Sequence, residues 1–533
     1  MPETPETPTQ RIERIKRDKA SWSILDDIRR YATLGFDAIP DDDLNVRFRA
    51  WGLYTQGDGL GVRGEATRHF MMRVRTPNGI LTSTMARTIA DLSDRYARGS
   101  LDITNRQNFQ LHWLRIEDVP AVWDALAAVG WTSMGACGDN TRTVTGCPLA
   151  GVDAAEIADA SSVALRVDRR MNGNPLYANL PRKFKISITG CAHWCTYPEI
   201  NDIGLTAVRR GDEIGFSLRV GGGLSTRPRL GDRLDAFVPW DAVPDVVDAV
   251  TAIFRDSDEL RVQRAKARMK FLFFTHGWTP DRFLAELSSR LGYRLAPAVA
   301  ESVPDGSFRD HVGIHPETGG TLYAGFTVAS GRTTPDAVRA LAALAEEYGS
   351  GELRTTAMQN IVILGVPHER RVVFERAAAR SAAPPLEGSA FRRGMLACTG
   401  SEYCKLAVAE TKRFSLDLIP ELERRLPGFT SNVKIFVTGC PNACGQHWIA
   451  DIGLQGAADG FDIFIGGGLG AAPGFAERTG VRVAASDAAD ALETLLRDYL
   501  ATKSESDTFR TWAARVGPDH VKNALALARS QPS

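Results

Sequence analysis

Eight cysteines carry the clearest chemistry in this chain of 533 residues. Four lie in the second half as two close pairs: five residues separate Cys398 from Cys404, and three separate Cys440 from Cys444. Both pairs lie in glycine-containing runs, and a proline follows Cys440. Thiolates from two such loops can enclose a four-iron, four-sulfur cluster, and these gaps exceed those of most zinc knuckles. The spacing therefore favours an iron–sulfur cluster over zinc or four unrelated buried thiols.

The cysteine pattern occurs twice in the chain. "FKISITGCAHWCTYPEINDIGLTA", from Phe184, aligns without gaps with "VKIFVTGCPNACGQHWIADIGLQG", from Val433, and three consecutive glycines follow in each half. The dipeptide Gln107-Asn108 likewise has a counterpart in Gln359-Asn360. Self-similarity of this kind indicates a duplicated and diverged chain.

The segments that must position these residues also come in two similar sets. "TSTMARTIADLSDRYARG" and "TPDAVRALAALAEEYGSG" have apolar residues at helical spacing, and each is flanked by strand-like runs. The order strand, helix, strand, found twice, predicts an α+β fold with sheets covered by helices.

Composition narrows the class of protein. Sixty-four basic residues balance sixty-four acidic ones, so the net charge favours neither nucleic acid nor an anionic membrane as a partner. No apolar run approaches the length of a membrane span, and the first twenty residues are polar. We therefore expect a cytoplasmic protein without a disulfide framework.

The cysteine runs are also recognisable as a family signature. "CTGSEYC" followed by "TGCPNAC" resembles the cluster signature of the siroheme- and iron–sulfur-dependent sulfite and nitrite reductases, in their single-chain, duplicated form. The resemblance runs from about Arg47 to the C-terminal helices. It implies a siroheme joined to one four-iron, four-sulfur cluster through a shared thiolate. By position that ligand is Cys444, and Cys398, Cys404 and Cys440 bind only the cluster.

The resemblance also implies an architecture: ferredoxin-like half-domains with two larger mixed α/β domains that bind siroheme and cluster, related by pseudo-twofold symmetry. We expect five segments. They are a polar tail (1–20), a first ferredoxin-like half-domain (21–130), a first siroheme-facing domain (131–300), a second half-domain (301–388) and a second siroheme-facing domain with the cluster (389–533).

Basic residues of the first half form the second set of candidates. By resemblance, four match the cations around the substrate-binding face of the siroheme iron, where they bind a small oxyanion and supply protons: Arg73, Arg142, Lys183 and Lys185. Guanidinium groups grip oxyanions bidentately, and ammonium groups act as point charges. In a strand, Lys183 and Lys185 project on the same side.

Six further residues are predicted to contact the cofactor. Arg106 is expected at the siroheme carboxylates by family position. Arg75 and Arg182 fall on the opposite strand face from their neighbours, so we expect cofactor-carboxylate or surface contacts. Asn105, Gln107 and Asn140 could bond the macrocycle or hold turns. His112 is expected to be structural.

The first half keeps four cysteines of its own: Cys137, Cys147, Cys191 and Cys195. Either they are relics or structural thiols, or they bind a second cluster. Nine residues separate Cys137 from Cys147, against five in the second half, which weakens the cluster interpretation. The second half in turn lacks the cations, since Asn432 stands opposite Lys183 and Met358 opposite Arg106.

The expected reaction is the six-electron reduction of sulfite to hydrogen sulfide. Nitrite to ammonia is the alternative, and Lys185 favours sulfite, because plant and cyanobacterial nitrite reductases tend to have asparagine there. A cobalamin-biosynthetic or electron-transfer relative is a further alternative. No dinucleotide fingerprint is found. Electrons must therefore come from a separate carrier, such as reduced ferredoxin.

Overall fold

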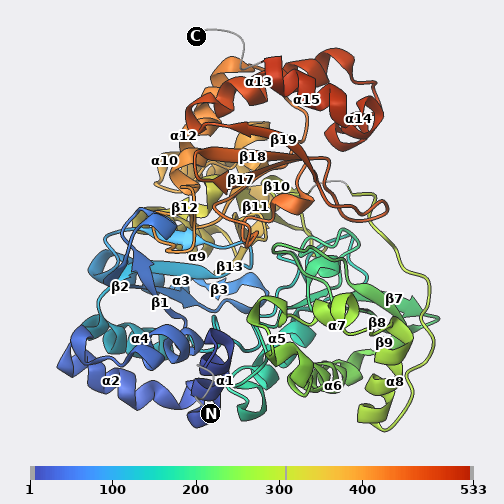
Figure 1. Ribbon diagram of the computed structural model, residues 1–533. Helices are drawn as coiled ribbons and strands as arrows, with labels where there is room; N and C mark the ends of the chain where they lie inside the picture. Colours follow the sequence, from blue (N-terminus) through green and yellow to red (C-terminus); the bar gives the residue numbers. More distant parts are fainter. Residues whose placement is uncertain (1–5, 307–308, 528–533) are drawn as a thin grey trace.

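The structure, a computed structural model, describes residues 6–306 and 309–527. Among these residues the strands form four sheets, each covered by helices (Figure 1). The predicted α+β, internally duplicated fold is confirmed. The blue half-domain and the green domain lie below the red C-terminal domain in Figure 1. No helix of the described part is both long and apolar enough to cross a bilayer.

Two five-stranded sheets belong to the ferredoxin-like half-domains. The first has the order β1-β2-β5-β4-β12 and the second β10-β11-β14-β13-β3. The strands of the first are β1 (Leu53–Gly57), β2 (Ala66–Val74), β4 (Leu101–Ile103), β5 (Phe109–Leu114) and β12 (Arg332–Thr333). Those of the second are β3 (Ile80–Thr82), β10 (Gly313–Pro316), β11 (Thr321–Phe326), β13 (Glu352–Thr355) and β14 (Ile361–Pro367).

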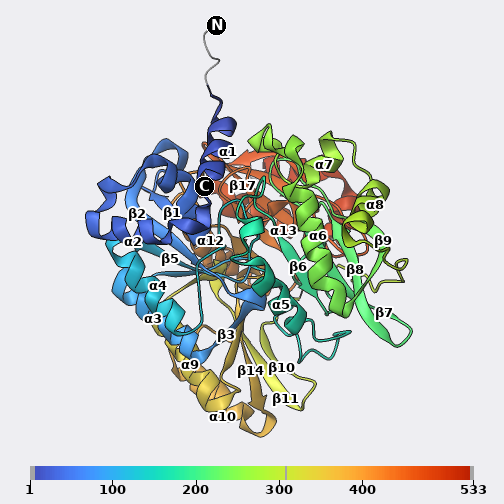
Figure 2. The ribbon, with the colours of Figure 1, turned by 90° about the horizontal axis from the view of Figure 1, so that it is seen from below.

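Each half-domain gives one strand to the other. β3 pairs antiparallel with β13, with Leu81 opposite Leu353, and β12 pairs antiparallel with β4, with Thr333 opposite Leu101. The neighbouring helices α3 (Ser83–Tyr96) and α9 (Pro335–Tyr348) pack side by side (Figure 2). One hydrophobic core therefore runs through both half-domains.

The helices around this core include α2 (Leu25–Leu34), α4 (Val119–Ala128) and α10 (Arg371–Arg380). A reciprocal ion pair ties α3 to α9. Arg87 reaches Glu346 at 2.5 Å, and Arg339, the residue in the same place on α9, pairs with Asp94, the counterpart of Glu346, and with Asp91 at 2.8 Å. The pseudo-twofold axis thus passes between two helices that bond each other in the same way.

The sheets of the two siroheme-facing domains also correspond to each other. In the first, β6 and β7 are parallel and β7, β8 and β9 antiparallel; in the second, β16 and β17 are parallel and β17, β18 and β19 antiparallel. The first domain contains β6 (Ile186–Thr189), β7 (Ile203–Arg210), β8 (Glu213–Val220), β9 (Asp232–Pro239), α5 (Ser161–Met171), α6 (Val243–Arg255), α7 (Lys270–Thr275) and α8 (Pro280–Leu291). The second contains β15 (Met395–Ala397), β16 (Ile435–Thr438), β17 (Ile452–Ala457), β18 (Gly460–Ile465), β19 (Glu477–Val483), α11 (Ala390–Gly394), α12 (Lys412–Arg425), α13 (Ala488–Thr502), α14 (Phe509–Val516) and α15 (Pro518–Leu527).

The expected polar tail is in part a docked helix, α1 (Pro8–Asp18). Thr7 caps it with a capping box. Lys16 is buried and donates to Glu13 (2.6 Å) and to the carbonyl of Leu180 (2.9 Å). The expectation of a tail was wrong for this stretch, because its polar residues find buried partners in the first larger domain. Residues 1–5 lie outside the described part.

Candidate functional site

The ends of two parallel strands hold the second-half cysteines. β15 and β16 pair in parallel, so Cys398 and Cys440 follow their carboxyl ends at the same sheet edge. The backbone N–H of Gly439 donates to the Cys398 thiol at 3.2 Å. A Cβ on Gly445 would lie 2.1 Å from the carbonyl of Val437, so only glycine allows this close turn after Cys444.

These four thiols fit a cluster better than a single ion. No three of them in the described chain have sulfur atoms within 4.8 Å of one another, whereas two thiolates on one zinc ion cannot be more than about 4.6 Å apart. Burial and the nearby Cys444 raise the pKa of Cys440 to about 12. Cys440 therefore holds its proton at neutral pH and releases it when it binds metal.

The first half places its cations opposite these thiols. Arg73 comes from β2, while Lys183 and Lys185 lead into β6. Residues 140–142 run beside Phe184, with the Arg142 N–H donating to its carbonyl at 2.7 Å. This pairing gathers Arg142 and the two lysines. Among the described residues, none of these four cations has a carboxylate within ion-pair distance.

The pKa values of the two lysines reflect their burial among like charges. Burial, with Arg268, Arg182 and Arg142 nearby, lowers the pKa of Lys183 to about 7, although Cys444 opposes the shift. Burial and the neighbouring Lys183 lower the pKa of Lys185 well below its usual value. An anion placed here would relieve both costs, since it compensates the charge that burial disfavours.

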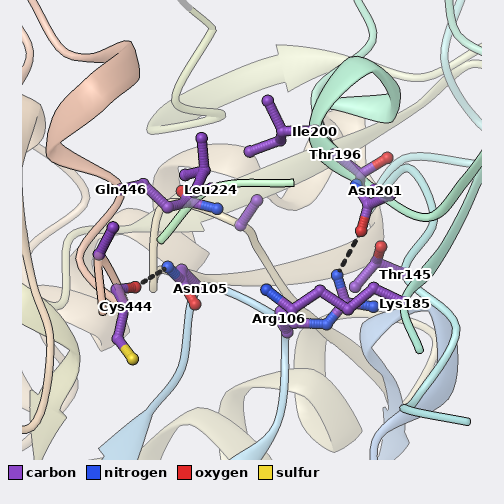
Figure 3. Close-up of a pocket in the computed structure, with 12 residues that line it drawn as sticks. Asn105, Arg106, Thr145, Lys185, Thr196, Ile200, Asn201, Leu224, Cys444 and Gln446 are labelled. Carbon is purple, nitrogen blue, oxygen red and sulfur yellow. Dashed lines mark hydrogen bonds between the residues drawn. The ribbon is translucent and has the colours of Figure 1, made fainter. Parts of the chain in front are cut away.

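A cavity joins the two halves at this point (Figure 3). It is lined from the first half by Asn105, Arg106, Lys185 and Asn201 and from the second by Cys444 and Gln446, among others. The Asn105 amide donates to the carbonyl of Cys444 at 2.7 Å. Arg106 donates to Asn201 at 2.8 Å, and burial and Arg142 lower its pKa to about 9. Cations of one half thus face the last cysteine of the other.

Buried polar atoms without partners mark the same region. In the described part of the chain, Nε of Arg73, Arg106 and Arg142 and both amide atoms of Asn140 make no hydrogen bond. Buried donors are rarely left unpaired in proteins. Together with the uncompensated charges, they fit a group that carries several carboxylates, as siroheme does.

Besides Asn105 and Arg106, whose partners are given above, three more of the six predicted cofactor contacts bond to other protein groups. Arg75 is buried and paired with Asp168, so the expected cofactor or surface contact is replaced by an interior ion pair. Gln107 is buried and donates to the carbonyls of Gly146 and Thr355, which ties the two halves together. Arg182 pairs with Asp139 at 3.1 Å.

The first-half cysteines separate into two groups. The sulfur atoms of Cys147, Cys191 and Cys195 lie within 4.8 Å of one another. Cys137 lies elsewhere and accepts from Nη1 of Arg73 at 3.2 Å. A second cluster held by all four cysteines therefore has no support in this geometry. His112 bonds Asp102 at 3.0 Å, in agreement with its structural interpretation.

Several residues at the cavity escaped sequence reasoning. Arg268 is buried and pairs with Asp202 at 2.8 Å, and its charge acts on Lys183, Lys185 and Arg106. Nothing in its local sequence distinguishes it from other arginines. Asp202 belongs to the repeated Asp-Ile-Gly triplet, where its carboxylate accepts from the backbone N–H of Lys185 at 2.8 Å. The repetition of this triplet was the sequence signal that could have identified Asp202.

The four second-half thiols are spaced for an iron–sulfur cluster, and one of them, Cys444, lies at a cationic cavity. These two features together indicate a redox protein that binds anions. Residues 137–295 and 388–532 match the family described as "Nitrite and sulphite reductase 4Fe-4S domain", and residues 63–129 and 315–380 match "Nitrite/Sulfite reductase ferredoxin-like half domain". The chain belongs to the nitrite and sulfite reductase family, whose members are oxidoreductases with an iron–sulfur cluster and siroheme.

Similar proteins span nearly the whole chain. "Sulfite reductase [ferredoxin] 1" of Mycolicibacterium paratuberculosis is 38% identical, covering 93% of this chain and 92% of that protein. "Ferredoxin--nitrite reductase" of Synechococcus elongatus is 36% identical, covering 92% and 96%. The solved structure of the Mycobacterium tuberculosis NirA protein is 34% identical, with a TM-score of 0.90 over 97% of this chain and 98% of that one.

Proposed function

We propose that this protein reduces sulfite to hydrogen sulfide by six electrons, which an external carrier such as ferredoxin supplies. The observation that carries the proposal is a set of partly buried cations without carboxylate partners in the described chain, Arg73, Arg142, Lys183 and Lys185, of which Lys185 lines the same cavity as Cys444. The similar proteins, which are named sulfite and nitrite reductases that use ferredoxin, support the same reaction class.

Each cation has a distinct task in this proposal. Arg73 and Arg142 bind the oxyanion with the guanidinium N–H groups that Cys137 and the carbonyls of Ala136 and Gly138 leave free, and Lys183 and Lys185 act as point charges. With a pKa of about 7, Lys183 can give up a proton at neutral pH, which the removal of oxygen as water requires. The same charges stabilise negative charge that develops on the departing oxygen.

The metal groups would be held from both halves. Cys398, Cys404, Cys440 and Cys444 would bind the cluster, with Cys444 shared with siroheme by its place in the family signature. The carboxylates of siroheme would meet Arg106, Asn140 and their neighbours. When bound, siroheme supplies the iron on which the oxyanion is reduced, and the cluster supplies electrons singly.

We propose one cluster per chain rather than two, because Cys137 stands apart from the other first-half thiols. Iron analysis tests this directly. Four cluster irons and one siroheme iron per chain are expected, and a further four would overturn the assignment. The same sample reports on the cobalamin-biosynthetic or electron-transfer alternative, because a protein without siroheme bands in its visible spectrum would favour it.

Nitrite is the second candidate substrate, since curated relatives of similar identity act on nitrite by name. Lys185 favours sulfite: near neutral pH sulfite is partly a dianion, and a second ammonium group binds it better than monovalent nitrite. We expect a larger kcat/KM for sulfite than for nitrite with the same reduced ferredoxin. A larger value for nitrite would overturn this preference. The expected cytoplasmic location stays a prediction for cell fractionation.

A variant pair sharpens the test. Lys185→Asn is expected to lower kcat/KM for sulfite more than for nitrite, because it removes one of two facing cations. Lys434→Asn is the matched control: Lys434 has the same place in the second half but lines a different cavity. An equal loss for both anions in Lys185→Asn would show that the residue does not select substrate.

A further inference from the structure

Three cysteines of the first half form a compact cluster outside the site described above. Cys147 and Cys191 are buried and Cys195 is partly buried, and their sulfur atoms all lie within 4.8 Å of one another. In the described chain this is the one group of metal-ligating side chains gathered so tightly.

This spacing suits one ion and excludes a cubane cluster. With Zn–S bonds of about 2.3 Å, two thiolates on a tetrahedral zinc lie about 3.8 Å apart, whereas thiolates at the corners of a cubane lie farther apart. The second-half cysteines, which fit the family cluster, contain no such triplet. The fourth cysteine of the duplicated pattern, Cys137, is held by Arg73 instead.

A carboxylate stands beside the thiols. Oδ2 of Asp153 lies 3.5 Å from Sγ of Cys191, and the Asp153 side chain is buried. This carboxylate is not within 4.8 Å of all three sulfur atoms, so it supports the site from beside Cys191 and is not one of the ligands. Asp153 is also oriented, since Arg309 donates to its Oδ2 at 2.5 Å and its Oδ1 accepts from the N–H of Ala155 at 3.1 Å.

From this geometry we infer that Cys147, Cys191 and Cys195 bind a single zinc ion, with water as the fourth ligand. Three thiolates around Zn²⁺ leave a net negative charge, which the Arg309 guanidinium and the N–H of His193, 3.3 Å from the Cys191 sulfur, offset. Leu149, Val362 and Leu364 belong to the apolar cluster around these cysteines and limit the access of further water.

A cavity next to Cys195 gives the triplet an entry route. Cys195 and Arg309 line this cavity together with His193 and Glu199, while Cys147 and Cys191 do not reach it. The ion would tie the loop of Cys147 and Asp153 to the loop after β6. Through Arg309 it would also hold the segment that enters the second half-domain. We therefore assign it a structural role, independent of the proposed reduction of sulfite.

Metal analysis of the full chain, purified from cells grown with added zinc, tests the site. We expect one zinc per chain in addition to the iron, and zinc K-edge absorption with three sulfur neighbours at about 2.3 Å and one oxygen at about 2.0 Å. Zinc should be lost in Cys191→Ser and in the partly exposed Cys195→Ser, and kept in Cys137→Ser, the matched control.

Other results would overturn the inference. These are a parent protein with only traces of zinc, zinc retained in both serine variants, additional iron in place of zinc, or a disulfide among the three cysteines in a non-reduced digest. If the serine variants fail to fold, the X-ray absorption of the parent still decides. Asp153→Ala, which removes the carboxylate beside Cys191, should lose zinc to a competing chelator at least about tenfold more readily, and unchanged retention would show that Asp153 does not support the site.

Discussion

The two halves of this molecule share a backbone and differ in what they carry. Left-handed conformations recur at matched non-glycine positions: Gln107 and Gln359 have φ of 62° and 66°, and Tyr197 and Gln446 have 55° and 59°. Duplication thus preserved even unfavourable backbone geometry. The cations that face the cavity belong to the first half and the cluster cysteines to the second, so neither half holds a complete site.

One matched pair shows how the halves diverged. Asp202 and Asp451 each accept from a lysine N–H at 2.8 Å, Lys185 and Lys434 respectively. Asp202 also pairs with Arg268, whereas burial raises the pKa of Asp451, for which no ion pair is found in the described chain. Both halves therefore keep the hydrogen bond from the lysine backbone N–H to the aspartate. Only in the first half does that aspartate also form an ion pair.

The cysteine loops give the largest expected contrast. Cys444→Ser should abolish activity and the absorption bands of siroheme and cluster together, because one residue serves both groups in the proposed site. Cys195→Ser, at the matched position of the first half, should keep those bands. A spectrum and an iron count of each variant would check this, and equal losses in both would contradict a division of labour between the halves.

The matched lysines give the next contrast. Lys185→Met removes a cation from the cavity and should lower kcat/KM by about 10²–10³, the usual cost of losing one preorganised charge. Lys434→Met should stay near the parent in steady-state assays, since its side chain lines another cavity. A large loss in Lys434→Met would mean that the second half takes part in substrate binding.

The pH dependence of anion binding should come from the first half, because Lys183 has the uncharged Asn432 as its counterpart in the second half. A lysine is charged below its pKa, here about 7, so anion binding should be strongest below pH 7 and weaken as pH rises through it. Nitrite is the better probe because it stays a monoanion across this range. KM for nitrite should rise toward alkaline pH, and Lys183→Arg should flatten the profile. A parent profile that is already flat would be the contrary result.

The paired glutamines test the symmetry itself. Gln107 bonds Gly146 and Thr355, and Gln359 bonds Ala397 and Ile103, so each crosses to the other half. Gln107→Ala and Gln359→Ala should each lower the free energy of unfolding by about 1–3 kcal/mol, because buried carbonyls lose their donors. Urea unfolding of both would show whether the costs match. A clear inequality would mean that one half dominates the interface.

The duplication, the cysteine sets and the α+β class could be predicted because they depend on residue types at fixed spacing. The partners of Arg75 and Gln107 could not, since Asp168 and Thr355 approach them only after the chain has folded. The exchange of β3 and β12 was also missed, because short strands pair by tertiary position and their sequences do not say with which sheet. Arg268 escaped for the same reason.

The smallest effect on the free energy of unfolding is expected for the ion pairs between α3 and α9. Arg87 and Arg339 make equivalent but largely exposed ion pairs between α3 and α9. Replacing either with alanine should cost about 0.2–1 kcal/mol, and less in high salt, since exposed pairs are screened. Denaturation at two salt concentrations measures this. A salt-independent loss would point to packing of the arginine stem rather than charge.

The exchanged strands bear on how such a chain could arise. In a homodimer of a single ancestral half, a twofold axis would let each subunit place one strand in its partner's sheet, and both edges would be covered at once. Fusion of two copies would keep that arrangement while freeing each to mutate alone. Either half expressed by itself would expose an unpaired sheet edge and part of a shared core, and should aggregate rather than fold.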